Sequence, residues 1–449
     1  MKDELRAAGA TDVQDFLNQH RFSPFQWLIF GLCFVIVLLD GFDTAAIGFI
    51  APSLMEQWGV SRQDLAPVLS AALFGLATGA LFAGPLSDRV GRKLVLAVSV
   101  LLFGLACAWS AFATDLTELA ILRFVTGIGL GAAMPNAVTL MSEYCPDRKR
   151  SMLTNAMFCG FPLGAACGGF LAAWMIPQWG WRSVLLLGGV APVLVAIVVV
   201  LLLPESVRFL LARGGRQDQV RAALRRISPS AGLASAFTMT EKTPPTQAGS
   251  GMGTGLSIIV ARPYLVGTLM LWITYFMGLV IFYSLINWMP LLLKDAGLAP
   301  RDATLVAALF PLGGVGAVLF GWLMDRYNAN AVTAAGFALT AASIFAIGQS
   351  AGQLGLLIGV VFVAGVAMNT AQCSLPSLAA SFYPTQGRAT GVSWMMGIGR
   401  LGGIAGSFLV AELARREFGF GGIFAVVALA GVAATIALLV KMAAEPGQD

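Results

Sequence analysis

Residues 28–52 read LIFGLCFVIVLLDGFDTAAIGFIAP, an apolar stretch that contains two aspartates, Asp40 and Asp43. The stretch is long enough for one helical crossing of a lipid bilayer, which takes roughly 20 residues. A charged side chain at the bilayer centre costs at least about 2.5–3.5 kcal/mol. Two carboxylates three residues apart therefore indicate a function, and the leading one is to bind and release a proton.

The composition of the whole chain is that of a membrane protein. Of its 449 residues 57% are hydrophobic and only 11% are charged, whereas soluble domains carry about 25% charged residues. Residues 1–25 lack the apolar core of a signal peptide, and TDVQDFLNQH within them predicts a short amphipathic surface helix. The lone histidine, His20, and six scattered cysteines form no metal-binding or nucleophile–base pattern. We therefore expect no metal, no enzymatic activity and no nucleic-acid partner.

Long apolar runs predict an all-α membrane protein with twelve transmembrane helices in two groups of six. The first six spans lie near 26–48, 63–86, 93–112, 116–141, 151–174 and 182–203, and the second six near 263–290, 301–323, 330–349, 353–377, 387–411 and 419–441. The expected organisation is an N-terminal segment (1–25), a six-helix bundle (26–203), a linker (204–262), a second bundle (263–441) and a tail (442–449). The linker is rich in charge, Ser, Gly, Thr and Pro, which predicts partial disorder.

The positive charges are distributed unevenly over the predicted loops. Most of the 28 lysines and arginines lie on the side of the N-terminus. The opposite side carries Arg62, Arg182, Lys294, Arg301, Arg415 and Arg416. Because positively charged loops tend to stay in the cytoplasm, both termini are expected to be cytoplasmic.

The two halves are related by an internal repeat. Three pairs of motifs recur 237 or 238 residues apart at equivalent spans: Asp88-Arg89 with Asp325-Arg326, RFVTG from Arg123 with VFVAG from Val361, and EYCPDRKR from Glu143 with SFYPTQGR from Ser381. Repeats of six spans are an architecture of secondary transporters, whose substrate site lies near the membrane midplane between the halves. We therefore predict a transporter with a central site.

The repeat does not duplicate the intramembrane charges. The element Asp40-Gly41-Phe42-Asp43 aligns with Met277-Gly278-Leu279-Val280, and Arg123 aligns with Val361. The buried acids and their nearest base are thus confined to the first half. We expect proton coupling in the first half and substrate binding mainly in the second.

Four charged residues are expected close to one layer of the membrane. At 1.5 Å of helical rise per residue, Asp40, Arg123 and Arg400 lie about 20 Å from the cytoplasmic side and Asp43 about 25 Å. Asp40 and Asp43 share a helix face. One aspartate is expected to pair with Arg123, and the other, buried beside a like charge, to accept a proton. Asp43 is favoured as the proton carrier, because Asp40 is closer in depth to Arg123. A purely structural ion pair is the alternative.

Arg400 and several residues of spans 7 and 11 are candidates for substrate binding. Arg400 has no acid in its own span, and a planar guanidinium binds carboxylates well. An anionic substrate is therefore expected, with pairing of Arg400 to Asp40 or Asp43 as the alternative. The other candidates are Tyr275 and Trp394 at mid-depth and Tyr283 and Asn287 near the outer end. Packing or interfacial anchoring is the common role of such aromatic residues.

Charged residues at the cytoplasmic ends of the spans predict a gate. The loop GPLSDRVGRK (84–93) lies between spans 2 and 3, and its repeat GWLMDRYNAN (321–330) lacks the basic ending. The two copies are therefore not expected to work alike. The predicted gating residues are Asp88, Arg89, Arg92, Glu143, Arg150, Asp325, Arg326 and Arg388. A role in membrane topology and lipid anchoring is the alternative.

These motifs together resemble the aromatic acid:proton symporter family of the major facilitator superfamily, over nearly the whole chain. The motifs that carry the resemblance are LLDGFDTAAIGFIAPSL (38–54), GPLSDRVGRK, RFVTGIGLGAAMPN (123–136), PESVRFL (204–210) and FYPTQGRATGVSWMMGIGR (382–400). The closest likeness is to permeases for 4-hydroxybenzoate and protocatechuate.

The resemblance implies uptake of benzoates with protons by alternating access across the bacterial inner membrane, for use in aromatic catabolism. It implies that Asp40, Asp43, Asp88 and Arg400 matter for transport, with the proton gradient in place of a cofactor and a monomer as the expected state. The alternatives are a transporter of another organic anion, an efflux antiporter or a sugar-type porter, since a PESVR-like element also occurs in sugar porters.

Overall fold

The structure is a computed structural model of the chain. It describes residues 10–212, 217–232, 234, 236–238, 259–316, 326–350, 352–383 and 385–444. Nearly all regular structure in these ranges is helical, and ten of the helices described are long and apolar enough to cross a membrane.

The first half of the chain forms a bundle of long helices. Its helices are α3 (Pro24–Trp58), α4 (Arg62–Val90), α5 (Arg92–Ser110), α6 (Leu116–Glu143), α7 (Asp147–Phe158), α8 (Gly160–Trp179) and α9 (Arg182–Leu202). Helices α7 and α8 follow each other at Cys159 and together occupy the predicted fifth span. The first of these helices, α3, runs ten residues beyond its predicted span, because a helix continues past the apolar core until a stop signal such as Gly59, here at φ 65°.

The second half repeats this arrangement. Its helices are α13 (Arg262–Asp295), α14 (Pro300–Leu312) with the 3-10 turn η2 (Gly313–Gly316), α16 (Ala329–Gln349), α17 (Leu354–Phe382), α18 (Thr385–Arg415) and α19 (Phe420–Ala444). Helices α4 and α14 occupy the places predicted for spans 2 and 8. The predicted fold of two six-helix bundles is confirmed.

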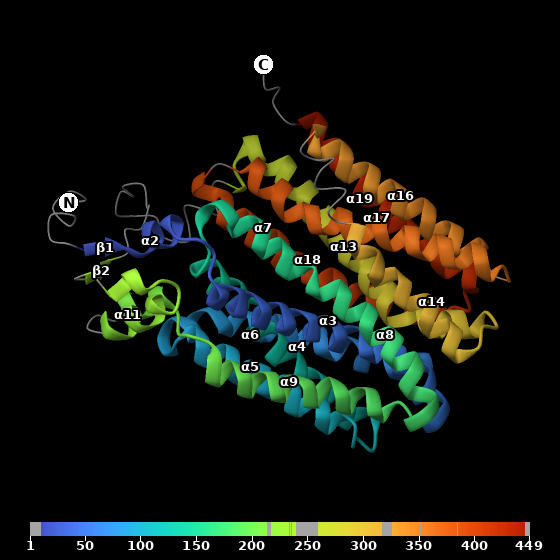
Figure 1. The fold of residues 1–449 in the computed structure, drawn as a ribbon. Coiled ribbons are helices and arrows are strands. Elements are labelled where there is room, and N and C mark those ends of the chain that lie inside the picture. The colour runs from blue at the N-terminus through green and yellow to red at the C-terminus, as the bar shows by residue number, and fades with distance from the viewer. Residues whose placement is uncertain are drawn as a thin grey trace.

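The two halves lie side by side with their helices roughly aligned (Figure 1). Across the interface α3 packs on α13, α4 on α18 and α8 on α14. The interface therefore brings Asp40 and Asp43 of α3 toward the second half, and Arg400 of α18 toward the first.

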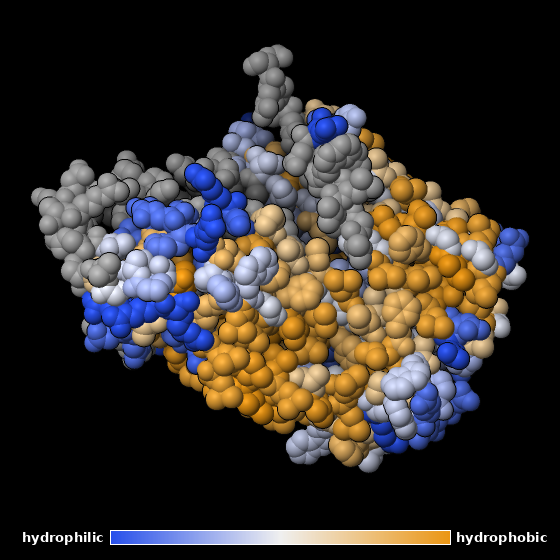
Figure 2. All heavy atoms as spheres, in the orientation of Figure 1, coloured by the Kyte–Doolittle hydropathy of each residue, from blue (hydrophilic) through white to orange (hydrophobic). Residues whose placement is uncertain are grey.

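The outer surface matches a bilayer setting. Figure 2 shows apolar residues across the middle of the molecule and hydrophilic residues toward its ends. Large apolar side chains face outward in this middle region, and Leu194, near the centre of α9, is 58% exposed. Such an extended apolar surface is typical of contact with lipid.

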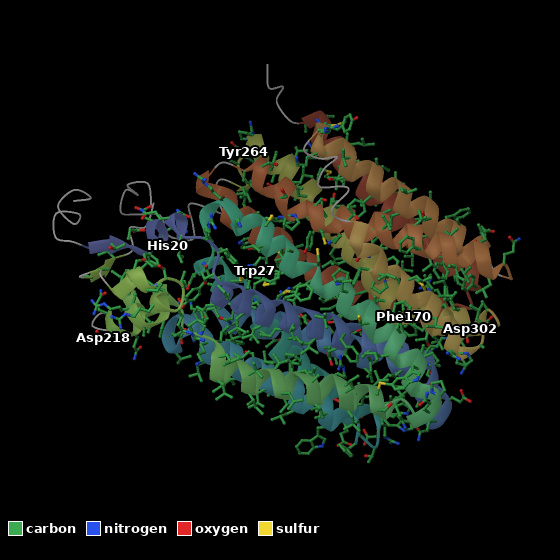
Figure 3. All side chains as sticks on the ribbon, in the orientation of Figure 1. His20, Trp27, Phe170, Asp218, Tyr264 and Asp302 are labelled. Atoms are coloured by element: carbon green, nitrogen blue, oxygen red, sulfur yellow. The ribbon has the colours of Figure 1, made fainter. Side chains whose placement is uncertain are left out.

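A small polar cap covers one end of the first bundle, which we call the terminal end. Strand β1 (Ala10–Asp12) pairs in parallel with β2 (Ala236–Thr238), and α2 (Val13–Gln19), α10 (Val207–Ala212), α11 (Gln217–Arg225) and the 3-10 turn η1 (Pro229–Gly232) complete the cap. Figure 3 shows His20 and Asp218 at this end and Asp302 at the opposite end.

The cap confirms the predicted amphipathic helix at 11–20, because α2 buries Val13, Phe16 and Leu17. It also shows that part of the linker is ordered. The Phe16 and Phe237 rings meet edge to face at 6.0 Å, and His20 Nε2 lies 2.9 Å from the Ser230 hydroxyl. Composition alone did not predict this, because the partner of the linker is the N-terminal segment. The disorder predicted for 239–258 lies outside the described residues.

Helix packing demands glycine at the centre of the acidic element. A Cβ added to Gly41 would lie 1.9 Å from the Phe161 backbone oxygen. Any side chain there would push α3 and α8 apart. Gly41 therefore lets α8 approach α3 closely between Asp40 and Asp43.

Candidate functional site

Asp43 and Arg123 form a fully buried ion pair between α3 and α6. Arg123 Nη1 donates to Asp43 Oδ1 at 2.8 Å, and Nη2 donates to Oδ2 at 2.8 Å. Nη2 also donates to the Asp43 backbone oxygen at 3.2 Å. Both side chains are 0% exposed. This two-pronged geometry is the strongest arrangement available to a carboxylate and a guanidinium, so each charge is neutralised by the other.

The pairing is the reverse of the one predicted from depth. We expected Arg123 to form an ion pair with Asp40 and Asp43 to bind the proton. In the structure Arg123 instead forms its ion pair with Asp43. The two aspartates differ by only about 4.5 Å along the helix, which lies within the reach of an arginine side chain. Depth along a helix axis therefore could not decide which aspartate the guanidinium reaches.

Asp40 is buried, at 4% exposure, and has no ion-pair partner in the part of the chain that the structure describes. The Thr44 hydroxyl, one turn later, is a weak donor to Oδ1 at 3.4 Å. Asp40 interacts electrostatically with Asp43 and, across the interface, with Arg400. A buried carboxyl group such as Asp40, with no ion-pair partner in the described structure, can bind a proton.

Arg400 of α18 is the charged residue that the second half contributes at this level. Nη1 donates to the Leu76 backbone oxygen of α4 at 3.3 Å, so the side chain crosses the interface between the halves. Within the described residues no carboxylate lies within 4 Å of it, and the alternative of an Arg400 ion pair with Asp40 or Asp43 is not realised. Its electrostatic neighbours on α13 are Tyr275 and Tyr283. The Arg400 guanidinium, which no carboxylate neutralises in the described structure, can therefore bind an anion.

The other predicted substrate contacts differ in their placement. Tyr275 packs its ring against Gly399, where an added Cβ would lie 2.0 Å from Tyr275 Cδ1. Asn287 donates from Nδ2 to the Ser407 hydroxyl at 2.9 Å, so its amide nitrogen is used within the second half. Trp394 is 43% exposed and stacks on Trp272 with ring centroids 6.0 Å apart.

A narrow cavity lies between the halves at this level. Thr44 and Arg123 of the first half and Tyr283 and Asn287 of the second line it. It offers about 10 Å³ to the centre of a water molecule, which is room for roughly one water. The described residues at this level thus leave space for about one water between the halves.

Two residues next to the charged cluster were missed by the sequence reasoning. Cys107 was noted only as one of six scattered cysteines, but it interacts electrostatically with both members of the Asp43–Arg123 pair. Gln372 of α17 was not singled out, and it interacts with Tyr275. Neither residue belongs to a motif, and their positions follow only from how the helices pack.

Two ion pairs join the halves at the end opposite the terminal end. Lys294 Nζ lies 2.9 Å from Glu56 Oε2, and Arg62 pairs with Asp295. These contacts connect the ends of α3 and α13 and the start of α4. Since the side chains are partly exposed, each pair stabilises the closed end only weakly.

The predicted gate at the terminal end contains a polar network in the first half. Glu143, 3% exposed, lies 3.7 Å from Arg92 Nε and accepts from the Ser206 hydroxyl. Glu205 Oε1 accepts from the backbone nitrogens of Arg92 at 2.9 Å and Lys93 at 3.1 Å. Glu205 thereby caps the start of α5 with a negative charge, where the helix dipole favours one. The PESVRFL motif was noted in the sequence, but this capping role was not predicted.

For the remaining predicted gating residues, a role in the gate stays a prediction. Arg89 and Arg326 are exposed at the terminal end. The side chains of Asp88, Arg150 and Arg388, and the whole of Asp325, lie outside what the structure describes.

The second half replaces the missing basic ending of its loop with a buried lysine. Lys441 was counted with the tail cations, but it is 1% exposed. Its Nζ donates to Asn330 Oδ1 at 2.9 Å and lies 4.4 Å from the centre of the Phe382 ring. A cation from span 12 thus reaches the start of span 9.

Comparison with known proteins places the chain among transporters. The model of the family described as Major Facilitator Superfamily matches residues 33–407 and 295–449. The 4-hydroxybenzoate transporter PcaK of Pseudomonas aeruginosa is 50% identical over 439 residues, covering 97% of both chains. A gallate transporter of Pseudomonas putida is 46% identical over 429 residues, covering 95% of this chain and 94% of the relative.

Solved structures share the fold. The inward-open xylose transporter XylE from E. coli superposes with a TM-score of 0.71 over 92% of this chain and 95% of that chain, at 19% identity. At this identity the likeness concerns the fold alone.

Proposed function

The chain belongs to the major facilitator superfamily, and from this premise we propose that it imports aromatic carboxylates together with protons. The main observation in support is that Asp40 of the first half and Arg400 of the second are electrostatic neighbours but do not form an ion pair with each other. Relatives that transport 4-hydroxybenzoate and gallate support hydroxylated benzoates as the substrate class. The chain is a transporter and not an enzyme.

Asp40 and Arg400 couple proton binding to anion binding in this proposal. Arg400 binds the substrate carboxylate, and the new negative charge favours protonation of nearby Asp40. Two unit charges about 4 Å apart interact by about 4 kcal/mol at an effective dielectric constant of 20. Because linkage is reciprocal, protonation of Asp40 also tightens anion binding, so the two ligands load together.

The remaining residues have supporting roles. The Asp43–Arg123 pair stays intact and holds α3 against α6 beside Asp40. Tyr275 and Tyr283 border the substrate ring, and the ion pairs at the opposite end open during alternating access. The distribution of Lys and Arg supports cytoplasmic termini in an inner membrane, which makes the terminal end the cytoplasmic side. Inward flux of the substrate follows from its proposed coupling to the inward movement of protons.

Uptake of labelled 4-hydroxybenzoate into proteoliposomes tests this function. We expect accumulation above the external concentration when the outside is acidic, and its collapse after addition of a protonophore. Protein-free liposomes and competition by uncharged 4-hydroxybenzyl alcohol serve as controls. Absence of gradient-stimulated accumulation for every benzoate would refute the proposal. Stimulation by the opposite gradient would identify an efflux antiporter.

Arg400→Lys is expected to raise the KM for 4-hydroxybenzoate about tenfold or more, although the charge is kept. An ammonium group cannot reproduce the planar fork that binds both carboxylate oxygens. Initial uptake rates over a range of substrate concentrations measure the effect. Arg415→Lys, at an exposed arginine that pairs with Glu412, is the matched control. An unchanged KM in Arg400→Lys would leave Arg400 a packing residue.

A further inference from the structure

We propose that Gln372 recognises the ring hydroxyl of the substrate, at the other end of the ring from the carboxylate that Arg400 binds. The inference rests on the proposed function and deepens it. It assigns selectivity for hydroxylated over unsubstituted benzoates to one carboxamide of α17.

Gln372 is a buried polar group without a hydrogen-bond partner. Both its amide nitrogen and its carbonyl oxygen are inaccessible to solvent and unpaired in the described structure. A buried donor or acceptor left unpaired costs about 1–3 kcal/mol, and native proteins keep few of them. Asn369, one turn earlier on the same helix, is satisfied, with Nδ2 donating to Phe310 and Gly365 carbonyls at 3.0 and 2.8 Å. Of the two carboxamides on α17, Asn369 is therefore hydrogen-bonded and Gln372 is not.

Gln372 lies against the segment of α13 that is the repeat counterpart of the acidic element Asp40–Asp43. A Cβ added to Gly278 would lie 1.9 Å from Gln372 Oε1, so the carboxamide rests directly on the backbone of α13. Gly278 is the repeat counterpart of Gly41, which separates Asp40 from Asp43. At the level of this glycine the first half thus carries two acids on α3, whereas in the second half a neutral carboxamide reaches the glycine from α17.

Tyr275 connects this carboxamide to the anion-binding residue. Tyr275 precedes Gly278 by one turn of α13, and it interacts with both Gln372 and Arg400. The Tyr275 hydroxyl is a hydrogen-bond neighbour of the Gln372 side chain, but neither amide atom of Gln372 has a partner at full hydrogen-bonding geometry. A guanidinium and an unsatisfied carboxamide of the second half are therefore both neighbours of one tyrosine.

The chemistry of these two groups matches the two ends of a hydroxybenzoate. A phenolic hydroxyl is neutral near pH 7 and can both donate and accept a hydrogen bond, and a carboxamide offers an N–H donor and a carbonyl acceptor to match it. The carboxylate suits the guanidinium instead. Sites that hydrogen-bond a substrate hydroxyl reject analogues that lack it, because the site's own polar groups then stay unpaired.

Parallel uptake of 4-hydroxybenzoate and benzoate by Gln372→Met tests the proposal. Methionine keeps the length of the side chain and removes its hydrogen bonding. We expect the kcat/KM for 4-hydroxybenzoate to fall about tenfold or more, while that for benzoate stays within about twofold, since one polar contact supports such discrimination. Gln349→Met, at an exposed glutamine of the same half, is the matched control. An unchanged ratio between the substrates, or an equal loss of both, would overturn the proposal.

Binding to the unaltered protein provides a test that does not depend on a variant. Calorimetry with 4-hydroxy-, 4-amino- and 4-methylbenzoate should rank the two hydrogen-bonding ligands about tenfold tighter than the methyl compound. Equal affinities across this series would refute the role of Gln372 even if Gln372→Met failed to fold. Failure of the wild type to bind or transport any benzoate would instead refute the proposed function.

Discussion

Asp40→Asn is expected to abolish proton-driven accumulation of the substrate while substrate exchange continues. Asp40 is the buried carboxyl group that no cation pairs with in the described structure, so its charge changes when a proton binds. Asparagine is nearly the same size and is permanently neutral, which imitates the protonated state. The variant should therefore bind the anion and move it in either direction without a proton.

Two assays in proteoliposomes separate these effects. Accumulation under an acid-outside gradient should fall to the level of equilibration, and counterflow of labelled against unlabelled 4-hydroxybenzoate should persist within about threefold of wild type, a difference of less than 1 kcal/mol. Thr44→Val, which removes the weak hydroxyl donor to Asp40, is the control and should keep accumulation. Wild-type accumulation in Asp40→Asn would show that the proton binds elsewhere.

Removing one member of the Asp43–Arg123 pair should have the largest effect on stability. Breaking a buried ion pair on one side leaves an uncompensated charge and costs about 3–5 kcal/mol. Arg123→Met and Asp43→Asn are both expected to destabilise the protein strongly, because both native side chains are 0% exposed. The double variant Asp43→Asn/Arg123→Met leaves no unpaired charge and should recover part of the loss.

Thermal unfolding of the purified variants measures this cycle. We expect a marked fall in Tm for each single variant and a higher Tm for the double variant than for Arg123→Met. Lys294→Met, which breaks the partly exposed pair with Glu56, is the control and should change Tm much less. Additive effects in the double variant would show that the two residues do not stabilise each other.

This prediction distinguishes two roles that looked interchangeable in the sequence. Asp43 was the expected proton carrier, and the structure pairs it with Arg123 instead. If Asp43→Asn lowers transport, its reduced stability explains the loss. Comparing the transport activity that remains per folded molecule in Asp40→Asn and Asp43→Asn therefore separates coupling from scaffolding.

Much of the fold could be predicted because its signals are local. Each span is a run of apolar residues that lipid requires to be helical, and the repeat follows from aligned motifs such as those at Asp88 and Asp325. The charged layer was also visible, since helical rise converts residue number into depth. The ordered part of the linker was not predicted, because its order depends on pairing with β1, more than 220 residues earlier.

The sequence by itself predicted a transporter of twelve spans with a duplicated architecture. It also placed the two acids of the membrane interior, Asp40 and Asp43, in the first half and Arg400 in the second. Only the tertiary structure decided that Arg123 pairs with Asp43, that Asp40 has no ion-pair partner among the described residues, and that the Gln372 carboxamide lies unpaired against Gly278. The physical reason is that depth depends on position along a single helix. Pairing depends on the rotation and approach of several helices and on the reach of their side chains, and Gly41 and Gly278 set how closely those helices come together.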